Sequence, residues 1–425
     1  MKKMKILFPY STGPEITSFY SLFFENILPE LKKTVDVKVI WVVYQPEKNI
    51  VTKSIDGIEV RYIQDYSDAL TILKEEQPDI LFSFPWPDFI AYSFSLSAKF
   101  LDLPTFSILF THTYQERSHK QTINSYASRF FEKSIPTDSS VNKKQFMRRG
   151  RFFLKKYKFL MKTQKSLGFN FIRIIKEFLM LIKLLLLETQ GTIDSRFATN
   201  IHFAVGENII QPYVEKGFKR DSIVLTGNPV YDSTFKRFSQ NNNNDKEFLN
   251  VLFAPSTLYE SGFWTKQQND FVVTEIIKTV SKEKDFRLTV KLHPSTARIS
   301  DYDYLINDID DSINLVQKGD IRDFLEQSDI YLSSETSTGE FFAVIARIPI
   351  VICRFFDESD DNILVQNKVA KLCANPNDLI EIIKNFKIQP ISEDDRQKFI
   401  QTYLYKDDGR ASERIANELI KLIKN

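Results

Sequence analysis

Apolar runs with the composition of buried strands alternate with helical patterns along most of this chain. We expect strands at 5–10, 37–43, 60–63, 78–84, 104–110, 200–207, 251–254, 287–292, 313–316, 329–332 and 348–353, and a strand that runs into a turn at 222–232. Strand–helix–strand alternation is typical of parallel sheets covered by helices. In such sheets ligands bind beyond the carboxyl ends of the strands. The sequence therefore predicts an α/β protein whose functional residues follow its strands.

A polar run without periodicity divides this alternation into two halves. Residues 240–245 read Gln-Asn-Asn-Asn-Asn-Asp, a composition that marks a linker. A chain of 425 residues has room for two separate cores. We therefore expect two doubly wound, Rossmann-like domains that face a cleft. Their predicted bounds are an N-terminal domain at 1–236, a linker at 237–248, a C-terminal domain at 249–400 and a helix at 401–425 that packs back on the N-terminal domain.

The composition narrows the functional classes. With 43% hydrophobic and 26% charged residues the chain reads as globular, and a net charge of +2 gives no field for nucleic acid. The two cysteines, Cys353 and Cys373, form neither a disulfide framework nor a zinc spacing. The acidic runs at 308–311 and 357–361 lie in polar loops, so we assign no metal and no cofactor. Because Met1 leads directly into a strand without a signal core, we expect a cytoplasmic protein.

Residues 118–196 break the alternation and form a basic, helical insertion in the first domain. Lysines and arginines are interleaved with Phe, Tyr, Leu and Met, and the apolar run at 169–187 is interrupted by charges that make it a poor membrane span. Two interpretations stay open. Residues 142–187 bind the cytoplasmic face of a membrane as amphipathic helices, or the insertion packs on its own domain or on a second subunit of a homodimer. Nucleic acid fits less well.

The second half contains a strand that ends in hydroxyl residues and opens a helix. The stretch at 330–342 reads Ile-Tyr-Leu-Ser-Ser-Glu-Thr-Ser-Thr-Gly-Glu-Phe-Phe. A helix start offers unpaired N–H donors and the positive end of the helix dipole, which together favour phosphate. The hydroxyls that could cap the helix or contact phosphate belong to Ser334, Thr336, Ser337 and Thr338. Glu340 could close a capping box or accept the hydroxyls of a ribose.

Two further strand ends of the second half carry candidate binding residues. Lys291-Leu-His293-Pro294 ends one strand with an imidazole that can donate to a phosphate oxygen, although a histidine there could also cap local carbonyls. Ser256 and Thr257 follow the first strand of this half and could meet a diphosphate from the opposite side, although Ser and Thr after Pro are ordinary turn residues. We expect these strand ends to form one nucleotide pocket.

Candidate catalytic residues follow strands of the first half. Glu15, Asp88 and His112 each come after one of these strands. A carboxylate or a histidine at such an edge could take a proton from an acceptor hydroxyl. His112 could equally have a structural role, because nothing near it in sequence identifies a partner.

The order of these motifs resembles that of a known superfamily. Ala254-Pro-Ser-Thr257, then His293-Pro294, then the stretch from Ser328 to Ser337 is similar to CDP-glycerol glycerophosphotransferases and to bacterial sialyl- and polysialyltransferases of the GT-B fold. The resemblance implies that His293 contacts the nucleotide, and that Ser337 and Thr338 contact its phosphates. It implies a metal-independent transferase that moves a sugar or polyol-phosphate from a CMP-, CDP- or UDP-activated donor to a cell-surface glycan or a lipid-linked acceptor.

A second resemblance, within the same fold, is to UDP-N-acetylglucosamine 2-epimerases. Motifs at 13–16, 201–207 and 226–232 together with His293-Pro294 look like theirs in the same order. The His-Arg…Glu-Asn signature of those enzymes is absent after the linker, where this chain has Ser256-Thr-Leu-Tyr-Glu260. The acids expected after the Ser/Gly motif fall near Phe341 and Phe342. The sequence thus leaves three functions open: a transferase, an epimerase, or a non-catalytic protein that binds nucleotide sugars.

Overall fold

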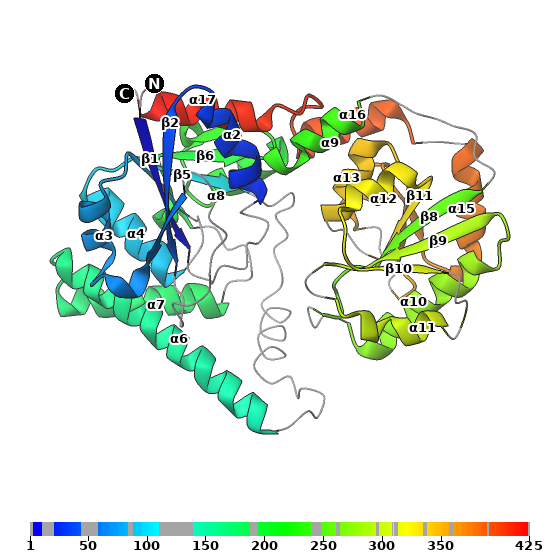
Figure 1. Ribbon diagram of the computed structural model, residues 1–425, viewed down its shortest axis with the longest axis horizontal. Coiled ribbons are helices and arrows are strands. Elements are labelled where there is room, and N and C mark those ends of the chain that lie inside the picture. Colours follow the sequence, from blue (N-terminus) through cyan, green and yellow to red (C-terminus); the bar gives the residue numbers. More distant parts are fainter. Residues whose placement is uncertain are drawn as a thin grey trace. The chain divides into compact units, whose positions relative to one another are not determined.

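A computed structural model divides the chain into two compact units (Figure 1). Unit 1 comprises Met1–Asp232, Tyr403–Tyr405 and Arg410–Asn425, and unit 2 comprises Ser233–Thr402 and Lys406–Gly409. The structure describes residues 3–10, 21–43, 58–83, 88–109, 139–187, 194–239, 248–260, 264–294, 297–307, 309, 313–334, 338–356, 361–388 and 391–423.

The described strands of unit 1 form one parallel sheet in the order β3-β2-β1-β4-β5-β6-β7. They are β1 (Lys3–Tyr10), β2 (Asp36–Val43), β3 (Ile58–Tyr62), β4 (Ile80–Phe82), β5 (Thr105–Leu109), β6 (Ile201–Ala204) and β7 (Ile223–Leu225). Both faces of the central strands are buried, which explains their continuous apolar runs. Aromatic rings pack together on one face: the ring centroid of Phe8 lies 4.4 Å from that of Phe23 and 5.3 Å from that of Phe82.

Helices and short helical turns connect these strands. They are η1 (Ser21–Ile27), α2 (Leu28–Lys32), η2 (Ile63–Asp65), α3 (Ala69–Glu76), α4 (Phe89–Phe100), η3 (Ser195–Phe197), η4 (Glu207–Ile209), α8 (Ile210–Glu215), η5 (Arg220–Ser222) and η6 (Pro229–Tyr231). The last helix of the chain, α17 (Ala411–Leu422), also belongs to unit 1. Its apolar face joins the core cluster that contains Phe23 and Phe24.

The basic insertion forms two helices, α6 (Ser139–Ser166) and α7 (Phe171–Leu187). Their inner faces pack on unit 1 itself: Leu160 of α6 and Leu181 and Leu184 of α7 are buried with Phe89 and Tyr92 of α4. The Tyr92 hydroxyl donates a hydrogen bond to Glu177, and Ser166 Oγ donates to Asp68 at 2.9 Å. The described part of the insertion is therefore anchored to its own unit along its inner face.

The described strands of unit 2 form a second parallel sheet, in the order β10-β9-β8-β11-β12-β13. They are β8 (Leu249–Ala254), β9 (Phe286–Lys291), β10 (Asn314–Val316), β11 (Ile330–Ser333), β12 (Ile350–Cys353) and β13 (Lys371–Cys373). The connecting helices are α9 (Asp232–Arg237), α10 (Lys266–Ser281), η7 (Ile299–Asp301), α11 (Asp303–Asn307), α12 (Ile321–Gln327), α13 (Thr338–Ala346), α14 (Ile363–Gln366), η8 (Pro376–Asp378), α15 (Leu379–Ile388) and α16 (Glu393–Tyr403).

The predicted fold class is confirmed: two doubly wound parallel sheets, with a helical insertion in the first unit. The sequence did not predict β13 or the helix α3. Strand β13 has three residues, which is too short for a periodic pattern to stand out.

Candidate nucleotide site

Four neighbouring strands of unit 2 end at the same edge of its sheet. In the sheet order β9-β8-β11-β12 all four strands are parallel, so their carboxyl ends point the same way. Ser333 of β11 is in register with Ala254 of β8 and with Ile352 of β12. The residues after these strands therefore lie together at the edge where doubly wound sheets bind ligands.

Two serines join the ends of β8 and β11. Ser256 Oγ and Ser334 Oγ lie 2.7 Å apart, and the Ser256 N–H donates to Ser334 Oγ at 3.2 Å. Both side chains are buried, with exposed fractions of 7% and 2%. Thr257, the next residue, is partly exposed. This hydrogen-bonded pair fixes the turn after β8 against the start of the segment that leads into α13.

The helix α13 begins at Thr338, whose side chain is exposed. Glu340 lies in its first turn and is fully buried, and a carboxylate is favoured there by the helix dipole. Thr336 and Ser337, also predicted to bind phosphate, lie outside the described residues. A nine-residue helix thus starts directly beyond the strand end that Ser334 and Ser256 hold together.

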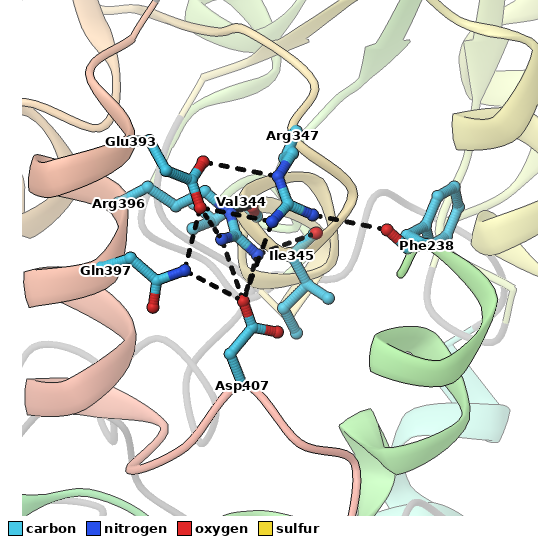
Figure 2. Close-up of polar contacts among 8 residues, drawn as sticks. All are labelled: Phe238, Val344, Ile345, Arg347, Glu393, Arg396, Gln397 and Asp407. Atoms are coloured by element: carbon cyan, nitrogen blue, oxygen red, sulfur yellow. Dashed lines mark hydrogen bonds and ion pairs between the residues drawn. The ribbon is translucent and has the colours of Figure 1, made fainter. Parts of the chain in front are cut away.

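The other end of α13 is fixed by a buried arginine (Figure 2). Arg396 Nε donates to the carbonyl of Val344 at 2.9 Å and Arg396 Nη2 donates to that of Ile345 at 3.3 Å, so the guanidinium caps the last turn of the helix. Asp407 and Glu393 pair with the same guanidinium at 3.0 and 2.7 Å. Because the buried guanidinium is neutralised by these two carboxylates, it can cap the end of α13 without an unpaired buried charge.

Lys291, the last residue of β9, is buried and turned toward backbone. Its Nζ donates to the carbonyls of Leu292 at 3.0 Å and Gln317 at 2.7 Å. Burial lowers the pKa of this lysine, and the negative charge of Asp320 opposes that shift. The ammonium fixes the turn that carries His293.

His293 follows Leu292 and is exposed, as is Pro294. Local burial lowers the pKa of His293; the charge of Glu260 opposes this effect and that of Lys291 adds to it. The imidazole is therefore neutral near pH 7 and able both to donate and to accept a hydrogen bond.

Glu260 was not among the residues expected from the sequence. It accepts a hydrogen bond from the Tyr302 hydroxyl at 2.9 Å, and its other carboxylate oxygen is buried without a partner among the described residues. Its negative charge favours the protonated form of His293 and so opposes the lowering of that histidine's pKa. The distance of 33 positions between the two residues hid this relation from sequence reasoning.

Arg354 is a second residue that the sequence did not single out. It directly follows β12, its exposed fraction is 8%, and its guanidinium pairs with Asp361. Its backbone N–H donates to the carbonyl of Cys373, at the end of the neighbouring strand β13, at 2.9 Å. An arginine at a strand's carboxyl end was a usable signal, because a guanidinium suits phosphate recognition.

Of the three predicted catalytic residues, the structure describes Asp88. Its carboxylate caps α4 by accepting from the N–H groups of Ile90 at 2.9 Å and Ala91 at 3.0 Å, and it pairs with Lys156 at 2.8 Å. Glu15 and His112 lie outside the described residues. Asp88 is thus placed at the carboxyl edge of the first sheet, where its carboxylate already has three partners.

Comparison with known proteins shows the fold. No protein family and no curated protein matches the sequence. Among solved structures, UDP-GlcNAc 2-epimerase from Neisseria meningitidis bound to UDP-GlcNAc is similar, with a TM-score of 0.52 and 16% identity over 98% of this chain and 100% of that chain. The calicheamicin glycosyltransferase CalG4 has a TM-score of 0.52 and 12% identity over 100% and 99% of the two chains. The glycotransferase of kitacinnamycin has a TM-score of 0.52 and 10% identity over 99% of both.

These similarities span both units, so the chain has the GT-B fold that these glycosyltransferases and the UDP-GlcNAc 2-epimerase share, and the expected fold is confirmed. Within the part of the chain that the structure describes, no helix is both long and apolar enough to cross a bilayer.

Proposed function

We propose that this chain is a nucleotide-sugar-dependent glycosyltransferase. It transfers a sugar or polyol-phosphate from a CMP-, CDP- or UDP-activated donor to a cell-surface glycan or a lipid-linked acceptor. The observation that carries the proposal is the carboxyl edge of the second sheet. There the linked Ser256 and Ser334, the start of α13 and His293 follow three adjacent strands. Hydroxyls, helix N–H groups and an imidazole are the donors that a nucleotide phosphate needs.

In this proposal the chain's own groups stabilise the leaving nucleotide, without a metal or a cofactor. As the bond between the transferred group and the nucleotide breaks, negative charge develops on the phosphate oxygens of the leaving nucleotide. The helix start at Thr338 and the imidazole of His293 are fixed in advance and stabilise that charge without reorganising. Lys291 contributes by fixing the turn beneath His293, since its ammonium already binds two carbonyls. Asp88, Glu15 and His112 remain the candidates for the base that activates the acceptor.

A thermal-shift screen with CMP, CDP, UDP, GDP and their sugars identifies the donor, because a ligand that binds only the native state raises the melting temperature. His293→Ala then weakens the affinity for that nucleotide about tenfold, the loss of one hydrogen bond to a charged group. Calorimetry measures the affinity and urea unfolding checks that stability is unchanged. Lys278→Ala, an exposed change on α10, is the control. An unaltered affinity of His293→Ala removes the residue from the site.

The second candidate function is that of a 2-epimerase, which the similarity to the Neisseria meningitidis enzyme favours. The two enzymes are separated by incubation with UDP-N-acetylglucosamine alone, because only an epimerase converts it without an acceptor. The third candidate is a protein that binds nucleotide sugars without catalysis. It is established if donors bind yet are neither transferred nor hydrolysed, and if His112→Ala changes nothing.

We also propose that the protein is peripheral on the cytoplasmic face of a membrane, held by the insertion. The outer face of α7 supports this: Phe171, Ile172 and Leu179 have exposed fractions of 75%, 65% and 60%, and the basic Lys176 and Lys183 lie among them. Apolar side chains with lysines on one helix face suit the headgroup region of an anionic bilayer. A second copy of the chain is the competing partner for this face.

A further inference from the structure

A cavity of about 310 Å³ opens on unit 1 between α6 and the turn after β3. Ile63, Gln64 and Tyr66 line it from the turn, Ile90 from the first turn of α4, and Phe159 from α6. Because η2 directly follows β3 and α4 follows β4, the cavity lies at the carboxyl edge of the first sheet. That edge is where doubly wound domains bind ligands.

The charge on the wall of the cavity is positive. Lys155, Lys156, Lys158 and Lys162 of α6 line it, and none of the described lining residues is acidic. Residues 155, 158, 159 and 162 share one helix face, so the sequence brings three of these lysines and the buried Phe159 to the same side. Lys156 is paired with Asp88 at 2.8 Å, which fixes its ammonium beside the start of α4.

Like charges three and four positions apart on a helix repel one another. Lys158 and Lys162 are such a pair, and the part of α6 with described side chains, from Phe153 to Ser166, contains no acid. A bound anion would relieve this repulsion. Its phosphate oxygens would accept hydrogen bonds from several ammonium groups, while Phe159, Ile63 and Ile90 offer an apolar floor.

We propose that this cavity binds a phosphate-bearing small molecule or headgroup. The volume is at the lower end of the range of about 300–1,000 Å³ for ligand pockets, which suits one phosphorylated sugar or polyol rather than a whole nucleotide sugar. In the proposed transferase this cavity would be a phosphate site for the acceptor. That assignment, unlike the cavity itself, rests on the proposed function. The anion has two sources, a soluble phosphate ester or the headgroup of a lipid.

The experiment measures binding to the full-length chain. Glycerol 3-phosphate and glucose 1-phosphate are titrated by calorimetry, with glycerol and glucose as uncharged counterparts. The test variant is Lys158→Gln with Lys162→Gln, both exposed side chains. The control is Lys278→Gln with Lys282→Gln, an exposed pair on and just after α10 with the same spacing and the same change of net charge.

We expect the test variant to bind the phosphate esters at least about tenfold more weakly than the wild type, and the control to bind within about twofold of it. Wild-type protein that binds neither ester nor anionic vesicles overturns the proposal. So does an equal loss in both double variants, because the effect then belongs to the overall charge.

Vesicles separate the two sources of the anion. The ligand is a lipid headgroup if the protein binds phosphatidylglycerol vesicles but not phosphatidylcholine vesicles, and if the test variant loses this binding while the control keeps it. The ligand is a soluble phosphate ester if the wild type binds the esters and the test variant binds vesicles as well as the wild type does. Nucleotide affinity, measured on the same samples, is expected to stay unchanged. If no nucleotide binds while the esters still do, the transferase proposal fails and the cavity's assignment stands.

Discussion

His202 is a fully buried histidine in β6, held by hydrogen bonds on both ring nitrogens. The Thr199 N–H donates to Nε2 at 3.1 Å, so Nδ1 carries the proton and donates to Ser107 Oγ at 2.6 Å. Burial lowers the pKa of His202 to about 4 from its ordinary 6.5. The folded state therefore contains the neutral ring, and its role is structural.

This burial predicts a pH-dependent stability. Between pH 6.5 and 4 the unfolded chain binds a proton at His202 that the folded chain does not, so the free energy of unfolding falls as the pH falls through this window. From pH 7 to pH 5 the loss is about 2 kcal/mol. His202→Asn has no titrating group at this position. Its free energy of unfolding should therefore fall by about 2 kcal/mol less than that of the wild type between pH 7 and pH 5. Urea unfolding at both pH values measures it, and identical pH profiles would contradict the assignment.

Asp88 has a structural role in the structure and is also one of the proposed catalytic bases. Its hydrogen bonds to Ile90 and Ala91 cap α4, so we expect Asp88→Ala to lower the free energy of unfolding by about 1 kcal/mol. Asp88→Asn keeps a capping side chain and should lower the free energy of unfolding by only about a few tenths of a kcal/mol. Urea unfolding measures both. A large loss of transfer activity in Asp88→Asn at unchanged stability would show that its charge acts in the reaction.

At the scale of elements, α7 presents two different faces. Its inner face joins the core through Ile174, Leu181 and Leu184, while Ile172 and Leu179 point away from that core and are mostly exposed. The helix therefore does not need its outer apolar side chains in order to pack on unit 1. An outer face that is apolar without a packing role marks an interaction surface.

Ile172→Ser with Leu179→Ser should weaken binding to phosphatidylglycerol vesicles about tenfold or more, because part of the apolar area that enters the bilayer is lost. Vesicle sedimentation measures the affinity. Ile299→Ser, an isoleucine of unit 2 with an exposed fraction of 45%, is the control and should bind normally. If the wild type is a dimer and the double variant a monomer by size-exclusion chromatography, with vesicle binding unchanged, α7 is a subunit interface instead.

At the scale of the whole molecule, the chain crosses from unit 1 to unit 2 and back. After α16 it returns to unit 1, where Asp232 accepts hydrogen bonds from the N–H groups of Ala411 at 2.9 Å and Ser412 at 2.7 Å. This carboxylate caps α17, whose residues Ile415, Leu419 and Ile420 complete the core of unit 1. The C-terminal helix is therefore part of the first unit's stability.

Asp232→Ala should lower the stability of unit 1 by about 1–3 kcal/mol, because it leaves two buried N–H groups without acceptors. Hydrogen exchange should show faster exchange of amides in α17 and β1, with amides of the unit 2 sheet unchanged. Asp329→Ala, which removes a carboxylate that accepts from the Asn250 N–H in unit 2, is the matched control. A uniform effect of Asp232→Ala on both units would show that they unfold together.

The sequence alone determined the fold class and the positions of the strand ends that carry the candidate nucleotide site. Long apolar strands such as those at 5–10 and 37–43 are legible because burial on both faces of a parallel sheet requires continuous apolar residues. Since ligand sites of such sheets follow the strands, the positions of Ser256, His293 and Ser334 were predictable without coordinates.

The tertiary structure decided what these side chains touch. These contacts join residues that are far apart in the sequence. The sequence therefore gave no sign that Tyr302 binds Glu260, that Ser256 binds Ser334, or that Arg396 caps α13. The same holds for the insertion. Its composition is equally compatible with packing and with surface binding, and only the structure shows that its inner face packs on α4 while its lysines line a cavity. Local pattern fixes which face of an element is apolar, whereas the partner of that face depends on residues far away in the sequence.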